Sequence, residues 1–224
     1  MEWETIVENF TAAKQQGKAC VIWMHGLGAD SSDMVGLAEQ LILRQEDFEH
    51  IFLNAPMRSV TLNQGMVMPA WYDIYGLSIL DREDAQGIKE SADLIMQAIQ
   101  LQQKNGYAAH QIFLAGFSQG GAMALYTAMQ SNLPLAGVIV LSAYLPLASQ
   151  CEPQLPKDTP LFIAYGKFDI IVQPKWSEYT REWLEKQGYH QMIAKAYPMQ
   201  HTICHEEIAD LSSWLTTHIE GITG

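Results

Sequence analysis

The chain has 224 residues, of which 48% are hydrophobic and 17% charged, a composition typical of a folded domain and not of a disordered chain. Acidic residues outnumber basic ones by 25 to 13, so the net charge is −12 and we expect no nucleic-acid partner. No apolar run is long enough to span a membrane, and no basic segment followed by an apolar one opens the chain. These features predict a single cytoplasmic domain over residues 1–224, without stable membrane insertion.

Neither a disulfide framework nor a metal site is expected. Cys20, Cys151 and Cys204 are odd in number and lack metal-ligand spacing, so they are interpreted as free thiols. His201 and His205 are four residues apart, but no glutamate follows His201 as the zinc-protease motif requires. We therefore predict no metal site.

Strands and helices are predicted to alternate along the chain. Short apolar runs predict buried strands, and segments with helical periodicity predict the helices between them. A first strand at 3–10 is only weakly indicated. The other predicted strands are 19–24, 51–53, 136–141, 161–165 and 191–197; the helices are 30–44, 84–104, 174–187 and 204–218; and 111–129 forms strand, tight turn and helix. This alternation predicts an α/β fold, a mostly parallel twisted sheet with helices on both faces.

The segment 57–82 is unusually long and apolar, without helical or strand periodicity. Long apolar loops in folded domains are usually functional, and methionine side chains repack easily. We expect this loop to cover a ligand cleft. Any single residue of this segment is equally well explained as part of a loop that folds over the core without contacting a ligand.

The strongest chemical signal is Gly116-Phe117-Ser118-Gln119-Gly120, between an apolar run and a run of helix formers. A tight strand-to-helix turn leaves no room for side chains two positions before and after its apex, and glycine meets that need at both places. Such a turn exposes the Ser118 hydroxyl and places the Gln119 backbone N–H at a helix N-terminus. Ser118 is therefore a candidate nucleophile; an ordinary turn with an incidental serine is the weaker alternative.

A serine nucleophile needs a base and an acid that orients it. The base must lie on a loop after a strand, at the same sheet edge as Ser118, and His25 and His201 meet that condition. His201 follows the last predicted strand, where the order serine, acid, histidine places it, whereas His25 is expected to hold a glycine-rich loop. Asp169 follows the preceding strand and is the candidate acid, with a turn-closing aspartate as the alternative. The backbone N–H groups of Leu27 and Gln119 are the candidate oxyanion donors.

With these residues in place, the chain resembles the α/β-hydrolase family of small carboxylesterases, lysophospholipases and acyl-protein thioesterases. The resemblance covers nearly the whole chain, and its most specific segments are 25–30 (HGLGAD), 55–56, 71–73 (WYD), 87–92, 116–123 (GFSQGGAM) and 197–201. It implies a triad of Ser118, Asp169 and His201, oxyanion donors at Leu27 and Gln119, and ester or thioester hydrolysis without a cofactor. Two departures are Tyr165 near the acid and Gln200 beside the base, where members usually have histidine and glycine.

We therefore predict a serine hydrolase that cleaves esters or thioesters of acyl chains through an acyl-enzyme intermediate. The substrate is a small molecule or an acylated protein, and the chain is a monomer or weak homodimer. Hydrophobic side chains suit an acyl chain, and the predicted contacts are Met66, Met68, Trp71 and Leu77. Two alternatives remain: a small peptidase, and a non-catalytic small-molecule binding module on the same fold.

Overall fold

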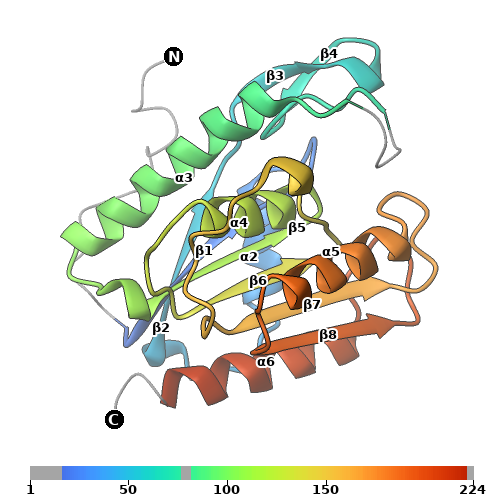
Figure 1. Ribbon diagram of the computed structural model, residues 1–224. Coiled ribbons are helices and arrows are strands. Elements are labelled where there is room, and N and C mark those ends of the chain that lie inside the picture. Colours follow the sequence, from blue (N-terminus) through green and yellow to red (C-terminus); the bar gives the residue numbers. More distant parts are fainter. Residues whose placement is uncertain (1–16, 77–81, 221–224) are drawn as a thin grey trace.

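A single parallel sheet forms the centre of the molecule. The structure is a computed structural model that describes residues 17–76 and 82–220 (Figure 1). Its six-stranded sheet has the order β2-β1-β5-β6-β7-β8, and every neighbouring pair is parallel. The strands are β1 (Ala19–Met24), β2 (Phe48–Leu53), β5 (Ile112–Phe117), β6 (Gly137–Leu141), β7 (Leu161–Gly166) and β8 (Met192–Tyr197). The weakly indicated strand at 3–10 lies outside the described residues.

Helices cover both faces of this sheet. They are α2 (Ser31–Ala38), α3 (Ala85–Lys104), α4 (Gln119–Met129), α5 (Pro174–Lys186) and α6 (His205–Glu220). Alternate residues of the inner strands point to opposite faces. One set, including Ile22 and Leu114, packs with α3, α4 and α5, and the other, including Trp23 and Phe113, packs with α2 and α6. Burial on both faces explains why these strands are continuous apolar runs, and the predicted α/β class is confirmed.

The helix predicted over 30–44 is shorter than expected. The Asp30 side chain caps its start by accepting from the Ser32 backbone N–H at 2.8 Å. The helix ends at Ala38. The Ile42 N–H, which would continue it, instead donates to the Ser212 hydroxyl of α6 at 3.0 Å. Because that partner is 170 positions away in the chain, the local sequence gives no sign of the early end.

The prediction that 57–82 lacks strands is wrong for its first half. Strands β3 (Met57–Val60) and β4 (Met66–Pro69) form an antiparallel hairpin around a short 3-10 turn, η2 (Thr61–Asn63). The more buried positions of β3 are Arg58 and Val60, one charged and one apolar, and all four residues of β4 are apolar. Apolar and polar residues therefore do not alternate along either strand, and no strand signal arises. In Figure 1 the hairpin lies beside the N-terminal end of α3, apart from the main sheet.

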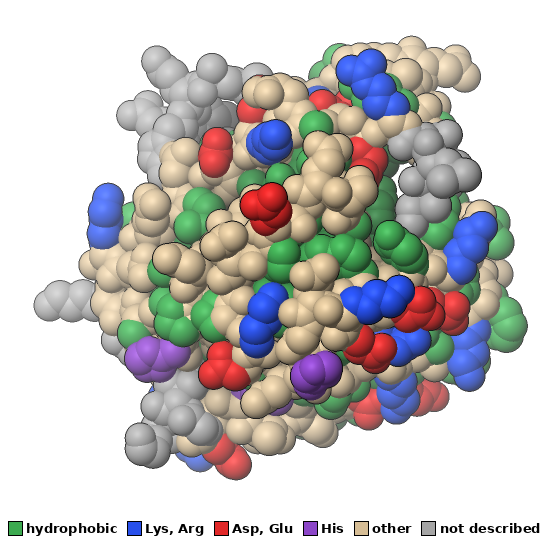
Figure 2. All heavy atoms as spheres, in the orientation of Figure 1, with side chains coloured by type: hydrophobic (Ala, Val, Ile, Leu, Met, Phe, Trp, Pro, Cys, Tyr) green, Lys and Arg blue, Asp and Glu red, His purple; other side chains and the backbone are tan. Residues whose placement is uncertain are grey.

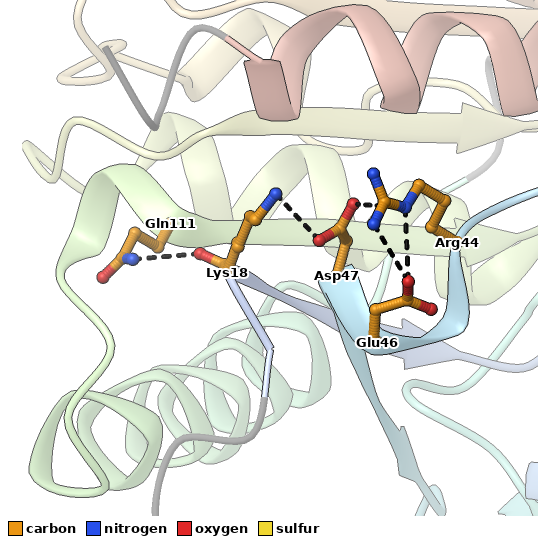
Figure 3. Close-up of polar contacts among 5 residues, drawn as sticks. All are labelled: Lys18, Arg44, Glu46, Asp47 and Gln111. Atoms are coloured by element: carbon orange, nitrogen blue, oxygen red, sulfur yellow. Dashed lines mark hydrogen bonds and ion pairs between the residues drawn. The ribbon is translucent and has the colours of Figure 1, made fainter.

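Polar contacts at the amino edge of the sheet join the starts of three strands (Figure 3). Asp47, in the short 3-10 turn η1 (Gln45–Asp47) before β2, pairs with Lys18 at 2.9 Å and with Arg44 at 3.7 Å. The carbonyl of Lys18, just before β1, accepts from the Gln111 side chain at 2.9 Å. These contacts hold the register of β2, β1 and β5, and they leave the carboxyl edge free for a site.

The helix α4 begins in direct contact with the sheet. A Cβ atom added at Gly120 would overlap the carbonyl groups of Met24 and His25 at the end of β1, and one at Gly116 would overlap the backbone of Gly120. Backbone atoms cannot give way as a flexible side chain can. Glycine at both positions is therefore required by close packing, as predicted from the motif.

We predict that Gly120→Ala lowers the free energy of unfolding by about 3 kcal/mol, because the new methyl group forces β1 and α4 apart. Gly36→Ala is the matched control, since nothing lies within 4 Å of its added Cβ. In α2 it should stabilise by up to about 1 kcal/mol through higher helix propensity. Urea unfolding measures both changes. Equal effects at the two positions would contradict the close-contact explanation.

A glutamate is buried in the first turn of α6. Glu207 has no solvent exposure, and neither carboxyl oxygen has a hydrogen-bond partner among the described residues. Burial raises the pKa of the Glu207 carboxyl to about 8, although the Cys204 backbone N–H nearby opposes the shift. Since the folded chain binds this proton more tightly than the unfolded chain does, Glu207 makes unfolding easier as the pH rises from about 4.5 towards 8.

We therefore predict that Glu207→Gln stabilises the protein at about pH 8 by more than at about pH 5, because glutamine does not ionise. Glu206→Gln is the control, because the exposed Glu206 has a pKa lowered by local hydrogen bonds and should show no such gain. Urea unfolding of the three proteins at both pH values measures the difference. A stability gain that is independent of pH would contradict it.

Candidate active site

Ser118 lies at the turn between β5 and α4 and has a strained backbone. Its φ is 54° and its ψ −121°, a conformation that residues with side chains rarely adopt. The turn is held by the Ser118 N–H, which donates to the carbonyl of Leu141 on β6 at 2.8 Å. The side chain is half-buried at the carboxyl edge of the sheet. Strain of about 1–3 kcal/mol at a non-glycine residue is a common feature of functional sites.

His201 lies on the loop after β8 and contacts Ser118. Its Nε2 is 2.9 Å from the Ser118 hydroxyl oxygen. The imidazole packs at a tilt against the Phe117 ring, with 4.9 Å between the ring centroids. His205, four residues further along, begins α6 and is exposed. The structure thus brings His201, and not His205, to the serine.

Asp169 completes a line of three polar side chains. It lies after β7 and is 3% exposed, and its Oδ2 is 2.7 Å from His201 Nδ1. Its Oδ1 accepts from the backbone N–H groups of Ile171 and Val172 at 2.8 and 2.9 Å. A carboxylate held this way accepts a hydrogen bond from the Nδ1–H group, so the proton stays on Nδ1 and the Nε2 lone pair faces the Ser118 hydroxyl. That is the tautomer a general base requires.

The two candidate oxyanion donors lie on either side of this turn. Gln119 is the first residue of α4, whose N-terminus carries positive partial charge. Leu27 lies in the loop after β1, and a Cβ added at the adjacent Gly26 would be 3.5 Å from Ser118 Cβ. Within the described part of the chain, neither the Leu27 nor the Gln119 N–H donates to a protein acceptor. Both N–H groups can therefore bind a substrate oxygen.

His25 is fully buried, and both ring nitrogens are hydrogen-bonded. Nδ1 donates to the Gly26 carbonyl at 2.7 Å, and Nε2 accepts from the Ala55 N–H at 3.0 Å. Burial lowers the pKa of His25, so the ring stays neutral with one defined tautomer. This geometry suits the structural role that the sequence suggested, holding the loop that carries Leu27.

The four predicted acyl-chain contacts have different surroundings. Met66, on β4, is 63% exposed, and Met68 is half-buried on the same strand. Trp71 is 1% exposed, and its indole N–H donates to the His25 carbonyl at 2.9 Å. Leu77 lies outside the described residues. The structure therefore places Trp71 against the loop that carries Leu27 and leaves Met66 on the surface of the hairpin.

A groove of about 450 Å³ beside His201 was missed by sequence reasoning. It runs between α2 and the loop after β8, and its lining includes Asp33, Leu37, Gln40, Phe117 and Ile203. The residues come from three separate parts of the chain, so no local motif could indicate them. Among the described residues that line this groove, Asp33 is the only one with a charged side chain, histidine aside.

Two further properties concern the described residues as a whole. No three histidine, cysteine, aspartate or glutamate side chains among them are placed to hold a metal ion together. No helix within residues 17–76 and 82–220 is long and apolar enough to cross a membrane. On the face shown in Figure 2, lysine and arginine side chains are scattered among acidic ones and form no continuous basic patch.

Comparison with known proteins gives a consistent result. Residues 7–219 match the family described as Phospholipase/Carboxylesterase. Acyl-protein thioesterase 1 of Neurospora crassa is 35% identical, with 90% of this chain and 87% of the relative covered; the Cryptococcus neoformans protein of that name is 32% identical, with 90% and 93% covered. Among solved structures, acyl-protein thioesterase 2 of Zea mays has a TM-score of 0.81 and 27% identity, with 92% and 96% covered. SOBER1 of Arabidopsis thaliana has a TM-score of 0.83 and 26% identity, with 90% and 99% covered. The chain belongs to the phospholipase/carboxylesterase family of α/β-hydrolases.

Proposed function

We propose that this hydrolase of the esterase class cleaves acyl esters and thioesters with Ser118 as nucleophile, His201 as general base and Asp169 as the orienting acid. One observation carries the assignment: the line of contacts from Asp169 to His201 at 2.7 Å and from His201 to Ser118 at 2.9 Å. These lengths lie within the range for transfer of a proton from a serine hydroxyl. The curated relatives named as acyl-protein thioesterases support the same reaction type.

The reaction proceeds in two halves. His201 Nε2 takes the Ser118 proton while the oxygen attacks the acyl carbonyl carbon, and the carbonyl oxygen becomes an oxyanion that the Leu27 and Gln119 N–H groups stabilise. The intermediate collapses, the bond to the alcohol or thiol breaks, and His201 gives that leaving group its proton. Water then attacks the acyl-enzyme while His201 takes its proton, the bond between the Ser118 oxygen and the acyl carbon breaks, and His201 returns the proton to Ser118 as the carboxylic acid leaves.

An acyl chain would find apolar surface near this edge of the sheet. Figure 2 shows hydrophobic side chains gathered along the middle of one face, above α5 as Figure 1 is drawn. Our proposed contacts to the chain remain Met66, Met68, Trp71 and Leu77, all from the segment 57–82, which we propose covers the cleft. The segment combines a hairpin with exposed methionines and a buried tryptophan, which suits a flexible apolar ligand.

An acylated protein is the substrate that we favour over a small ester. His201 protonates the leaving group, so the leaving group must lie beside His201 during the reaction. The groove next to His201 is open to solvent along α2 and leaves room for a polypeptide there.

A cytoplasmic location fits the cysteines, since all three are free thiols, which persist in reducing compartments. We also keep the prediction of a monomer or weak homodimer, which light scattering would measure.

We predict that Ser118→Ala and His201→Ala each lower kcat on a p-nitrophenyl ester by about 10⁴-fold or more, and Asp169→Asn by about 10⁴-fold, because each removes one part of the proton path. Labelling with a fluorophosphonate probe, followed by peptide mapping, should modify Ser118 in the wild type and fail in His201→Ala. A correctly folded wild type that is neither labelled nor active would favour the binding-module alternative.

The peptidase alternative predicts cleavage of amides. We expect the wild type to hydrolyse a thioester or oxygen ester at least about 10³-fold faster than the amide of the same acyl group, because nothing assigned here assists departure of the poorer amine leaving group. Matched substrates that differ only in the scissile atom measure this ratio. Comparable rates on the amide would contradict the esterase assignment in favour of a peptidase.

If the leaving group lies in the groove, the charge of Asp33 should affect which peptides are cleaved. We expect Asp33→Lys to lower kcat/KM for an S-acylated peptide with basic flanking residues by about 3–10-fold through charge repulsion. The same variant should leave kcat/KM unchanged for a small neutral thioester of the same acyl chain. The effect should shrink at high salt, because Asp33 is exposed. An equal loss on both substrates would show that Asp33 does not contact the leaving group.

A further inference from the structure

The side chain of Gln119 has bonding partners that the proposed mechanism does not use. The residue is 4% exposed and enters the mechanism only through its backbone N–H. Its carboxamide oxygen accepts from the Trp71 backbone N–H at 2.8 Å, and its carboxamide nitrogen donates to the Tyr72 carbonyl at 2.7 Å. Trp71 and Tyr72 are 48 and 47 positions away in the chain. A buried amide with both ends satisfied is a fixed contact and costly to break.

The segment that Gln119 binds also holds the loop that carries Leu27. The indole N–H of Trp71 donates to the His25 carbonyl at 2.9 Å. Just before it, the Pro69 carbonyl accepts from the Gly28 N–H at 2.9 Å. Leu27 therefore lies between two residues whose backbones are held by the segment 69–72. Its N–H has little freedom to move unless that segment moves.

These contacts link the two oxyanion donors to each other. The path runs from the Gln119 backbone through its own side chain to Trp71, from the Trp71 indole to His25, and from His25 along the chain to Leu27. Trp71 is itself secured, because its carbonyl accepts from the Ser91 hydroxyl of α3. Gln119 thus carries one oxyanion donor on its own backbone and helps to hold the other, the Leu27 N–H, through its side chain.

We propose that the Gln119 carboxamide is a positioning residue that sets the spacing between the Gln119 and Leu27 N–H groups. The proposal rests on the function proposed above, since it concerns how that oxyanion site is built. The carboxamide touches no reacting atom and acts only through the segment 69–72. A purely structural role is the competing explanation, and it would affect stability and leave the chemistry of the folded enzyme intact.

The two explanations differ in kinetics. A negatively charged oxygen develops only on the way to the transition state, so misplaced donors lower kcat and hardly affect substrate binding. Removing one donor outright lowers kcat by about 10²–10³-fold, so displacing one should cost less. Gln119→Met has similar volume and neither hydrogen bond. We expect its kcat on a soluble ester to fall by about 10–100-fold with KM changed by less than about threefold.

Gln102→Met is the matched control. Gln102 is also a glutamine with no exposed surface, and it lies near the end of α3, at the amino edge of the sheet and away from Ser118. Its substitution should change stability in urea while kcat stays at the wild-type value. If Gln119→Met matches this control in kcat, the positioning role is overturned and the carboxamide is structural.

Gln119→Glu gives a second test that depends on pH. When the glutamate is ionised, a negatively charged oxygen faces the Tyr72 carbonyl oxygen and repels it. When it is protonated, the carboxyl group can accept a hydrogen bond from the Trp71 N–H and donate one to the Tyr72 carbonyl. We expect the ratio of variant to wild-type kcat to rise as the pH is lowered from about 8 to about 5, because burial raises the pKa of a carboxyl. His25, Tyr72 and His201 are titratable groups near this position and are present in both proteins, so the wild type is measured at every pH as the reference. A ratio that does not change with pH would count against the proposal, even if Gln119→Met failed to fold.

Trp71→Phe tests the path itself. It keeps an aromatic ring and loses the indole N–H that holds His25. If Gln119 acts through Trp71, the double variant Gln119→Met, Trp71→Phe should lose less kcat than the product of the two single losses, whereas independent effects would multiply. Wild-type turnover that is unaffected by Ser118→Ala would overturn the proposed function and this inference with it. Full Ser118 dependence with multiplying losses would overturn the inference alone.

Discussion

The candidate site depends on the close contact between the first turn of α4 and the end of β1. Gly120 lies so near the carbonyls of Met24 and His25 that no side chain fits between them. This contact forces the chain to leave β5 and enter α4 within one residue, and Ser118 takes the strained φ of 54° as a result. The hydroxyl then stands at the carboxyl edge, with the positive end of α4 directly behind it. Strain at one residue is thus maintained by packing at its neighbours.

Most polar groups around Ser118 have fixed partners. Asp169 uses one oxygen for His201 and the other for two backbone N–H groups, and neutral His25 uses both ring nitrogens on backbone atoms. Such preorganisation lets the oxyanion form without rearranging the protein, which is where serine hydrolases gain much of their rate. The carboxamide of Gln119 extends the same arrangement to the segment 69–72.

The surroundings of the site contrast with this order. The hairpin of β3 and β4 has exposed apolar side chains, Met57, Met66 and Val67 among them, and lies apart from the main sheet. Beside Asp169, Phe168 and Ile170 are 62% and 80% exposed. A rigid catalytic arrangement bordered by adaptable apolar surface fits a hydrolase whose substrate carries an acyl chain, because the chemistry needs precise placement and the chain does not.

The sequence by itself determined the parallel sheet and the turn at Ser118, because both follow from local signals: continuous apolar runs, and glycines two residues either side of a serine. Chain order then favoured Asp169 and His201 over other acids and histidines. Tertiary structure alone decided the rest. The early end of α2 depends on Ser212, and the Gln119 carboxamide binds residues 47 and 48 positions away. In the hairpin, apolar and polar residues do not alternate with burial, because Arg58 and Val60 share the more buried side of β3. Contacts between distant residues leave no periodicity in either partner, so only the folded chain reveals them.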